Sequence, residues 1–451
     1  MSPPVLLDPS IPELSSYASG SLLRRSVLPS GLRVLSEQVP GAQSVSIGFW
    51  IPVGSRDESA ANAAHPSTFG STHFLEHLLF KGTPTRSALD IAIAFDEIGG
   101  EHNALTAKEH TCYHAKVQAG DLPIALDVLA DMVAASVIEQ GEFDTERNVI
   151  LEELAMADDD PGDVANERFY EAVLGEHPLG RPIGGNPATI NAVTRDAVLA
   201  HYREHYRPQN VVLTVAGAVD HERLLVLLGD ALARAGWNLD AAHPPAARRP
   251  SELAATQLQP ASVVTRPLEQ VNLFVGTRAL VASDPRRFVM SVLNAVLGTG
   301  MSSRLFQEIR EKRGLAYSVS SFASGFSDAG VFGLYAGCAA PAVPTVVALM
   351  FDELARLADG GISEDEHRRA IGQLRGASAL ALEDSDTRMA RLGRSEIGSG
   401  EFLDFDAAVA RLGEVTREHV QQLASELASQ PFSAAAVGPI DRLEHPKLVA
   451  V

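Results

Sequence analysis

The chain has 451 residues, of which 45% are hydrophobic and 21% are charged, and its formal net charge is −20. A chain of this length exceeds what one ordinary hydrophobic core organises, so we expect two or three domains. The negative charge argues against a nucleic-acid partner, because phosphate binding needs clustered lysine and arginine.

The N-terminal end and the cysteines indicate the compartment. Residues 1–20 lack the basic region followed by an apolar core that marks a secretory signal, and they lack the arginines of a transit peptide. No apolar run approaches the ~20 residues that a membrane helix needs. The two cysteines, Cys112 and Cys338, exclude a disulfide framework. We therefore expect a cytoplasmic protein without a membrane segment.

The first half of the chain alternates between strand-like and helix-like stretches. Residues 22–56 contain two strand-like runs, each preceded by a Pro/Gly turn signal. The stretch 71–80, STHFLEHLLF, has a helical pattern, with Ser71 or Thr72 as the expected cap. The pattern then predicts a helix over 86–98, a strand pair over 101–117, and helices over 121–137 and 142–157.

The order of elements repeats after a linker. Residues 238–260 contain four prolines and little periodicity, and the stretches that follow have the same order as the opening strands, helices and strand pair. Further helices are expected at 341–359 and 363–383, before a terminal strand, SAAAVG. We predict an α+β fold of two duplicated domains, each a mostly antiparallel sheet packed against helices. The expected ranges are an N-terminal extension 1–21, a metal-binding domain 22–237, the linker, and a homologous domain 261–451 without a metal motif.

The stretch 71–80 carries the strongest chemical signal. His73 and His77 are four residues apart, so they project from one face of the predicted helix, and Glu76 lies beside them. Two imidazoles one turn apart can hold a divalent metal, and a nearby carboxylate can act on water there. The pattern H-x-x-E-H is the inverse of the commoner H-E-x-x-H zinc motif.

A metal held by two histidines commonly has a carboxylate as its third protein ligand. The acidic helix 142–157 offers two adjacent candidates, Glu152 and Glu153. Glu146 and Glu153 are seven residues apart and share a helical face, whereas Glu152 points about 100° away.

The segment H-F-L-E-H, together with ERNVILEE at 146–153, resembles the inverzincin metallopeptidases of the pitrilysin and processing-peptidase family. The resemblance implies Glu153 as the third zinc ligand and Glu146 behind the metal, outside its ligand set. It also implies one zinc ion per chain, with Glu76 as general base of an endopeptidase that cleaves peptides or unfolded segments.

The resemblance extends to substrate-binding elements. The family has a GGxxNAxT strand, here GGEHNALT at 99–106, which implies that Asn103 and Ala104 pair with an extended substrate as an added strand. The family's R-x6-Y pair corresponds to Arg310 and Tyr317, which implies that Arg310 binds substrate backbone and Tyr317 donates to the developing oxyanion. The preceding loop, GTGMSS, is shorter and less Gly-rich than that of the processing peptidases.

The resemblance also has a consequence for assembly. In this family two bowl-shaped halves of two domains each close around a chamber, and a two-domain chain supplies one bowl. We expect a homodimer in which Arg310 and Tyr317 serve the zinc site of the partner.

Two other functions remain open. Relatives of this fold serve as non-catalytic core or assembly subunits, which typically lack part of the metal set. A two-His-one-carboxylate site can also hold the iron of an oxygenase, although that triad usually lies on strands with H-x-D spacing.

Overall fold

A computed structural model describes residues 4–62, 66–254 and 256–449. The chain forms two compact units whose segments alternate along the sequence. The first unit consists of the residues up to Leu154 together with Pro182–Arg248 and Leu380–Ala407. The second consists of Ala155–Arg181, Arg249–Ala379 and the residues from Ala408 onward. Each unit contains one large sheet, which agrees with the predicted duplication.

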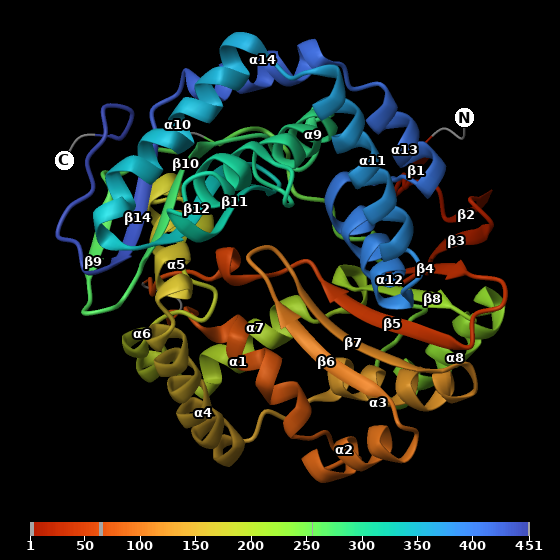
Figure 1. Ribbon diagram of the computed structural model, residues 1–451. Coiled ribbons are helices and arrows are strands. Elements are labelled where there is room, and N and C mark those ends of the chain that lie inside the picture. Colours follow the sequence, from red (N-terminus) through yellow and green to blue (C-terminus); the bar gives the residue numbers. More distant parts are fainter. Residues whose placement is uncertain (1–3, 63–65, 255, 450–451) are drawn as a thin grey trace. The chain divides into compact units, whose positions relative to one another are not determined.

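A seven-stranded sheet forms the centre of the first unit (Figure 1). Neighbouring strands pair antiparallel, except for the parallel pair β4–β8. In spatial order the strands are β2 (Glu13–Ala18), β3 (Ser21–Val27), β4 (Arg33–Gln38), β8 (Val212–Gly217), β5 (Ser44–Ile51), β7 (Thr111–Gln118) and β6 (Glu101–Thr106). The segment 1–21, expected as an extension, thus contributes β2 to this sheet, and β6 lies at the other edge.

Both faces of the central strands of this sheet are buried, and β5 shows how. Val45, Ile47 and Phe49 alternate along β5 and join the core formed with the helices that follow β5 in sequence. Trp50 points to the opposite face. The helices that follow β5 in this unit are α1 (Ser71–Leu78), α2 (Ala88–Glu97), α3 (Leu122–Ala135), α4 (Gln140–Asp159), α6 (Pro187–Ala192), α7 (Arg195–His205) and α8 (His221–Arg234). Helix α4 belongs to this unit as far as Leu154, and its last residues belong to the second unit.

The opposite face is covered by a helix from much later in the sequence. Helix α12 (Ser385–Arg394) lies over β5 and β8, and Figure 1 shows it in blue above the red β5. Two glycines allow this close approach: a Cβ at Gly48 would lie 2.5 Å from Sδ of Met389, and one at Gly393 would lie 2.2 Å from the Trp50 ring. The sequence analysis assigned no element to this stretch.

The second unit repeats the plan with a five-stranded sheet. Its strands in spatial order are β11 (Ala316–Gly325), β12 (Gly330–Cys338), β10 (Val271–Arg278), β14 (Ser433–Gly438) and β9 (Ser262–Thr265), and its parallel pair is β14–β9. One face packs against α9 (Arg287–Leu297), α10 (Val343–Gly360) and α14 (Arg417–Ala428), with α11 (Glu364–Ala381) beside them.

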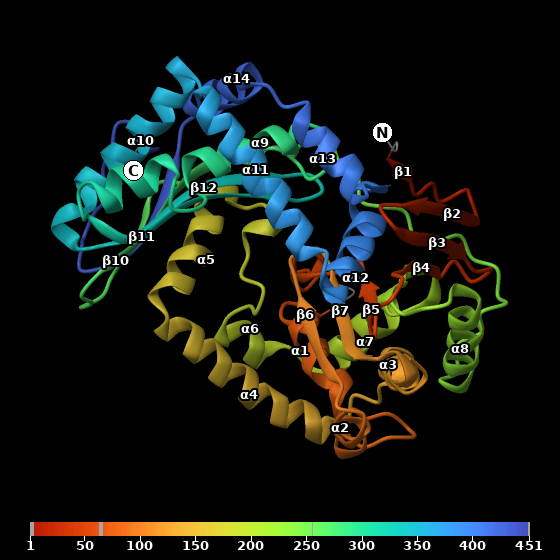
Figure 2. The ribbon, with the colours of Figure 1, turned by 45° about the vertical axis from the view of Figure 1, so that its right-hand side comes forward.

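The other face of this second sheet receives α5 (Pro161–Leu174), a helix from the first half of the chain. Figures 1 and 2 show α5 in yellow against the strands, where Phe169 stacks on Phe274 at 5.5 Å between ring centres. Each half of the sequence therefore supplies a helix to the sheet of the other half.

Small elements complete the chain. Strand β1 (Val5–Leu6) pairs with β13 (Glu401–Phe402), and α13 (Phe405–Gly413) follows. Two π-helical turns occur, η6 (Phe306–Glu311) and η8 (Ser395–Ser399). In the described part of the chain no helix is both long enough and apolar enough to cross a membrane.

Candidate metal centre

Helix α1 begins differently from the sequence-based expectation. Its N-cap is Gly70 in the left-handed region, with φ 89°, and Ser71 and Thr72 already lie inside the helix, so neither is the cap. The carboxylate of Glu58 takes that role, because it accepts hydrogen bonds of 2.8 Å from the backbone N–H groups of Gly70 and Thr72. A negative charge at the helix N-terminus also favours the helix dipole. No local sequence pattern marks Glu58, which lies 12 residues before the cap.

Helices α1 and α4 bring three potential ligands together. One ligand atom from each of His73, His77 and Glu153 lies within 4.8 Å of the other two. The Oε2 atom of Glu153 is 3.6 Å from Nε2 of His73 and 3.4 Å from Nε2 of His77. The two Nε2 atoms are 3.3 Å apart. Two imidazole nitrogens and one carboxylate oxygen converging in this way suit a divalent cation such as zinc.

Burial keeps His73 in the protonation state that can bind a metal. Burial, with His77 as a further cause, lowers the pKa of His73 to about 4, although the charge of Glu153 opposes the shift. His73 is therefore neutral at physiological pH, as a ligand must be. The side chain of Glu153 is 46% exposed, so the group opens toward solvent on this side.

Glu146 orients His77 from behind. Its side chain is 3% exposed, and Oε2 lies 3.0 Å from Nδ1 of His77. A carboxylate there favours the proton on Nδ1 and leaves the lone pair of Nε2 free to bind a metal. The Nζ atom of Lys81 lies 2.6 Å from the other oxygen, Oε1. The sequence analysis missed Lys81. Its position four residues after His77, about one helical turn, could have indicated that it lies on the same side as the predicted metal-binding histidines.

Aromatic packing holds the two helices in register. The rings of Phe74 and Phe143 stack with centres 4.7 Å apart, and the Arg147 guanidinium lies 4.7 Å from the centre of the Phe143 ring. Arg147 also donates to the backbone carbonyls of Ile190 and Val193 at α6. These contacts fix the separation of α1 and α4, and hence of the histidines from Glu153.

The remaining predicted residues of this unit take different places. Glu76 is half-buried on α1 beside the two histidines and is not one of the three converging groups. Glu152 is exposed and also lies outside that group, which leaves Glu153 as the carboxylate of the set. Asn103 and Ala104 lie on β6, the edge strand, where Oδ1 of Asn103 accepts from the N–H of Ala104 at 2.8 Å.

Arg310 and Tyr317 lie together in the second unit. The Arg310 guanidinium carbon lies 4.5 Å from the centre of the Tyr317 ring, and Nη1 donates to the Tyr317 carbonyl at 3.1 Å. The Tyr317 side chain is 72% exposed, so its hydroxyl group is accessible. Arg310 belongs to the π-turn η6, a feature frequent at functional sites.

Comparison with known proteins identifies the family. The model described as insulinase, peptidase family M16, matches residues 33–186, and the model described as the peptidase M16 inactive domain matches residues 192–374. An uncharacterized zinc protease of Streptomyces coelicolor is 45% identical over 93% of this chain and 90% of its own length. The chain belongs to peptidase family M16. Another relative, an uncharacterized zinc protease of Mycobacterium tuberculosis, is 43% identical over 92% of this chain and 93% of its own length.

Solved structures agree on the fold of this M16 chain. A crystal structure described as a peptidase M16 inactive domain from Pseudomonas fluorescens has a TM-score of 0.81 at 19% identity, and covers 94% of this chain and 99% of its own. A protease from Helicobacter pylori has a TM-score of 0.80 at 22% identity, with 92% and 99% covered.

The family matches divide the predicted residues into two sets. His73, His77 and Glu153 fall in the first match, and Arg310 and Tyr317 fall in the match to the inactive domain. The converging metal-ligand group lies in the first of these regions. The names of the relatives support a metallopeptidase.

Proposed function

We propose that this M16 chain is a zinc-dependent endopeptidase whose metal is held by His73, His77 and Glu153. The observation that carries the proposal is the convergence of one ligand atom from each residue within 4.8 Å. The burial that keeps His73 neutral and the Glu146 carboxylate on Nδ1 of His77 support it further. A non-catalytic subunit of the same fold would have no need to retain this set.

The residues around the centre have distinct tasks. Zinc bound there supplies a Lewis acid that polarises the peptide carbonyl and lowers the pKa of water. Glu76 accepts a proton from the attacking water and delivers it to the departing amine. Glu146 keeps His77 in the tautomer that directs Nε2 at the metal.

We propose peptides and unfolded segments as substrates, because only an extended chain can pair with the edge strand β6. The edge position of β6 leaves backbone groups available for an added strand. The position of Asn103 and Ala104 on this strand supports their role in that pairing.

A homodimer is proposed as the active form, in which Arg310 and Tyr317 of one protomer act on the substrate at the zinc of its partner. Tyr317 is 72% exposed, and this exposure supports contact with another protomer. Glu76→Gln and Tyr317→Phe protomers, each impaired alone, should regain about a quarter of wild-type activity when mixed. No recovery in the mixed sample contradicts action in trans.

The decisive test compares Glu76→Gln with Glu152→Gln. Glu152 is the matched control, because it has the same side chain but is exposed and lies outside the converging group. Both variants should contain about one zinc ion per chain by atomic absorption. Glu76→Gln should lose cleavage of a fluorogenic peptide library by at least about 10²-fold, since a general base contributes 10²–10⁴-fold. Glu152→Gln and the wild type should cleave, and a chelator should stop them. Wild-type activity in Glu76→Gln excludes the proposed base, and bound iron instead of zinc would favour the oxygenase.

A further inference from the structure

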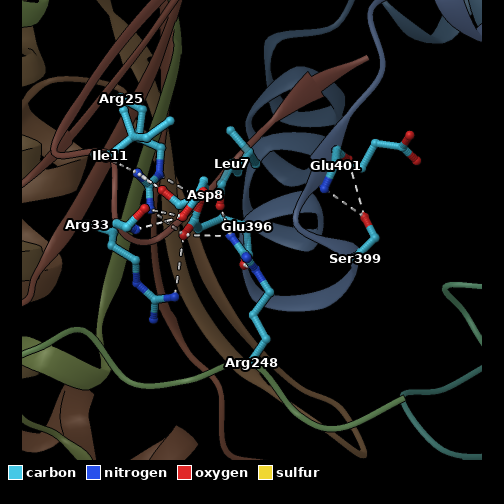
Figure 3. Close-up of polar contacts among 10 residues, drawn as sticks. Leu7, Asp8, Ile11, Arg25, Arg33, Arg248, Glu396, Ser399 and Glu401 are labelled. Atoms are coloured by element: carbon cyan, nitrogen blue, oxygen red, sulfur yellow. Dashed lines mark hydrogen bonds and ion pairs between the residues drawn. The ribbon is translucent and has the colours of Figure 1, made fainter. Parts of the chain in front are cut away.

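A buried cluster of arginines lies in the first unit, on the sheet face covered by α12. It comprises Arg25 on β3, Arg33 on β4 and Arg248 after α8, gathered around Glu396 of the π-turn η8 (Figure 3). Arg25, Arg33 and Glu396 are 0%, 2% and 0% exposed. Buried charges are normally balanced, because each costs several kcal/mol to remove from water.

Glu396 cannot balance the three cations. Its Oε1 atom is shared by all of them, at 3.1 Å from Arg25, 3.4 Å from Arg33 and 3.2 Å from Arg248. The nearby Asp8 carboxylate is at the surface, where it accepts from the backbone N–H and hydroxyl of Ser10. Three guanidinium groups surround one buried carboxylate, and the exposed Asp8, which interacts with the charges of Arg25 and Arg248, offsets only part of the positive excess.

Two of the arginines are well paired. Arg25 donates Nε and Nη2 to Glu396 and Nη1 to the carbonyls of Ile11 and Asp8. Arg248 donates to the Glu396 backbone carbonyl at 2.6 Å and to the carbonyl of Leu7. These contacts tie the N-terminal segment to η8.

Arg33 is poorly paired although it is buried. Within the described residues the Arg33 guanidinium makes a single hydrogen bond, from Nη1 to Glu396 at 3.4 Å. Its buried Nε has no partner among these residues. Burial lowers the pKa of Arg33, Glu396 opposes this, and the charges of Arg248 and Arg25 lower it further. In Figure 3 part of the Arg33 guanidinium faces away from Glu396. An unpaired buried donor destabilises the folded protein, and more so when it is charged.

We propose that this arginine cluster is a site for a small free oxyanion of the phosphate or sulfate type, bound by the unpaired edge of Arg33. A bound oxyanion adds negative charge to this positive cluster, and its several oxygens can accept from more than one N–H group of Arg33, which chloride cannot do in the same geometry. The buried position of the cluster selects a free ion over a phosphoryl group on a larger molecule. Since Glu396 and Arg248 belong to the same cluster, the ion also stabilises the packing of the segment Leu380–Ala407 in the first unit.

The test uses the full-length, zinc-loaded protein with inorganic phosphate as the probe, at constant ionic strength and pH 7.5. Phosphate should raise the melting temperature in a saturable manner by about 3 °C or more over chloride. Arg33→Gln should abolish the saturable rise. Arg24→Gln is the matched control, because Arg24 is next to Arg25 on β3 but pairs with the exposed Glu222. It should keep the rise.

Phosphate also stabilises proteins generally by exclusion from their surface, without saturation. An equal rise in the wild type and Arg33→Gln therefore overturns the proposal. Equilibrium dialysis with radiolabelled phosphate gives a second measurement, with about one ion expected per wild-type chain and none for Arg33→Gln. If Arg33→Gln does not fold, Arg248→Gln replaces it, since Arg248 is partly exposed. Undiminished phosphate binding by the folded variant likewise contradicts the site.

Discussion

Nδ1 of His77 lies 3.0 Å from Oε2 of Glu146, a carboxylate whose side chain is almost fully buried. If His77 binds zinc as proposed, this contact would set its tautomer and make zinc binding depend on a residue outside the converging group. Lys81, on the other carboxylate oxygen, keeps the buried negative charge paired.

Glu146→Gln should weaken zinc binding by about 10–100-fold, because an amide is a poorer acceptor for Nδ1–H and loses the ion pair with Lys81. Competition with a chromophoric chelator measures the affinity. Glu152→Gln removes a charge from the same helix without touching the centre and should bind zinc as the wild type does. An unchanged affinity in Glu146→Gln excludes its orienting role.

Glu153→Gln should reduce zinc affinity more than Glu146→Gln does, by at least about 100-fold, because it replaces a direct anionic ligand. The same competition assay applies, with Glu152→Gln again as the control. If Glu152→Gln were the variant that lost zinc, the assignment of the third ligand would be reversed.

Gly393→Ala should destabilise the first unit by about 1–3 kcal/mol, because its new methyl group would overlap the Trp50 ring and push α12 from the sheet. Differential scanning calorimetry should show a lower melting temperature. The control, Gly376→Ala in helix α11, meets nothing within 4 Å and should be neutral or slightly stabilising. Equal melting temperatures for the two variants would show that α12 does not pack as described.

The buried His201 predicts a loss of stability in acid. Burial lowers its pKa to about 3, so it stays neutral in the folded state, whereas it is protonated below about pH 6.5 in the unfolded chain. The unfolded state then binds the extra proton, and stability falls as the pH drops from about 6.5 toward 3. His201→Gln should lose about 2 kcal/mol less than the wild type between pH 7.5 and pH 5.

Urea unfolding at the two pH values measures this difference. Replacement of the exposed His243 by Gln is the control and should leave the pH dependence of the wild type unchanged. A wild-type pH dependence in His201→Gln would assign the acid sensitivity to other groups.

Local sequence patterns predicted much of the fold and of the centre. The spacing of His73 and His77 and the seven-residue spacing of Glu146 and Glu153 are properties of single helices, so the periodicity of 3.6 was sufficient to place each pair on one face. The resemblance to the peptidase family then selected Glu153 over Glu152. The structure brings His73, His77 and Glu153 together, and their roles, like that of Glu76, remain predictions for the assays above.

The features that were missed depend on contacts between distant segments. Glu58 caps α1 across an intervening loop, and Glu396 meets Arg25 across more than 370 residues of sequence. The expected cap at Ser71 or Thr72 was wrong because a remote carboxylate satisfied the helix N-terminus instead. Helix α12 was also missed, since the sequence analysis assigned no element to its stretch, and its partner surface lies on the distant strands β5 and β8.

The exchange of α5 and α12 constrains the order in which the protein can fold during synthesis. All strands of the first sheet have left the ribosome once residue 217 has emerged, yet the face around Trp50 has no cover until Arg394 follows. Over that interval an apolar surface stays exposed to water, together with Arg25 and Arg33, which are buried only in the folded protein, so the nascent chain is open to aggregation or to binding by a chaperone. The parts of the chain before and after Arg248 would each lack a helix that covers their own sheet, so we expect neither part to fold independently.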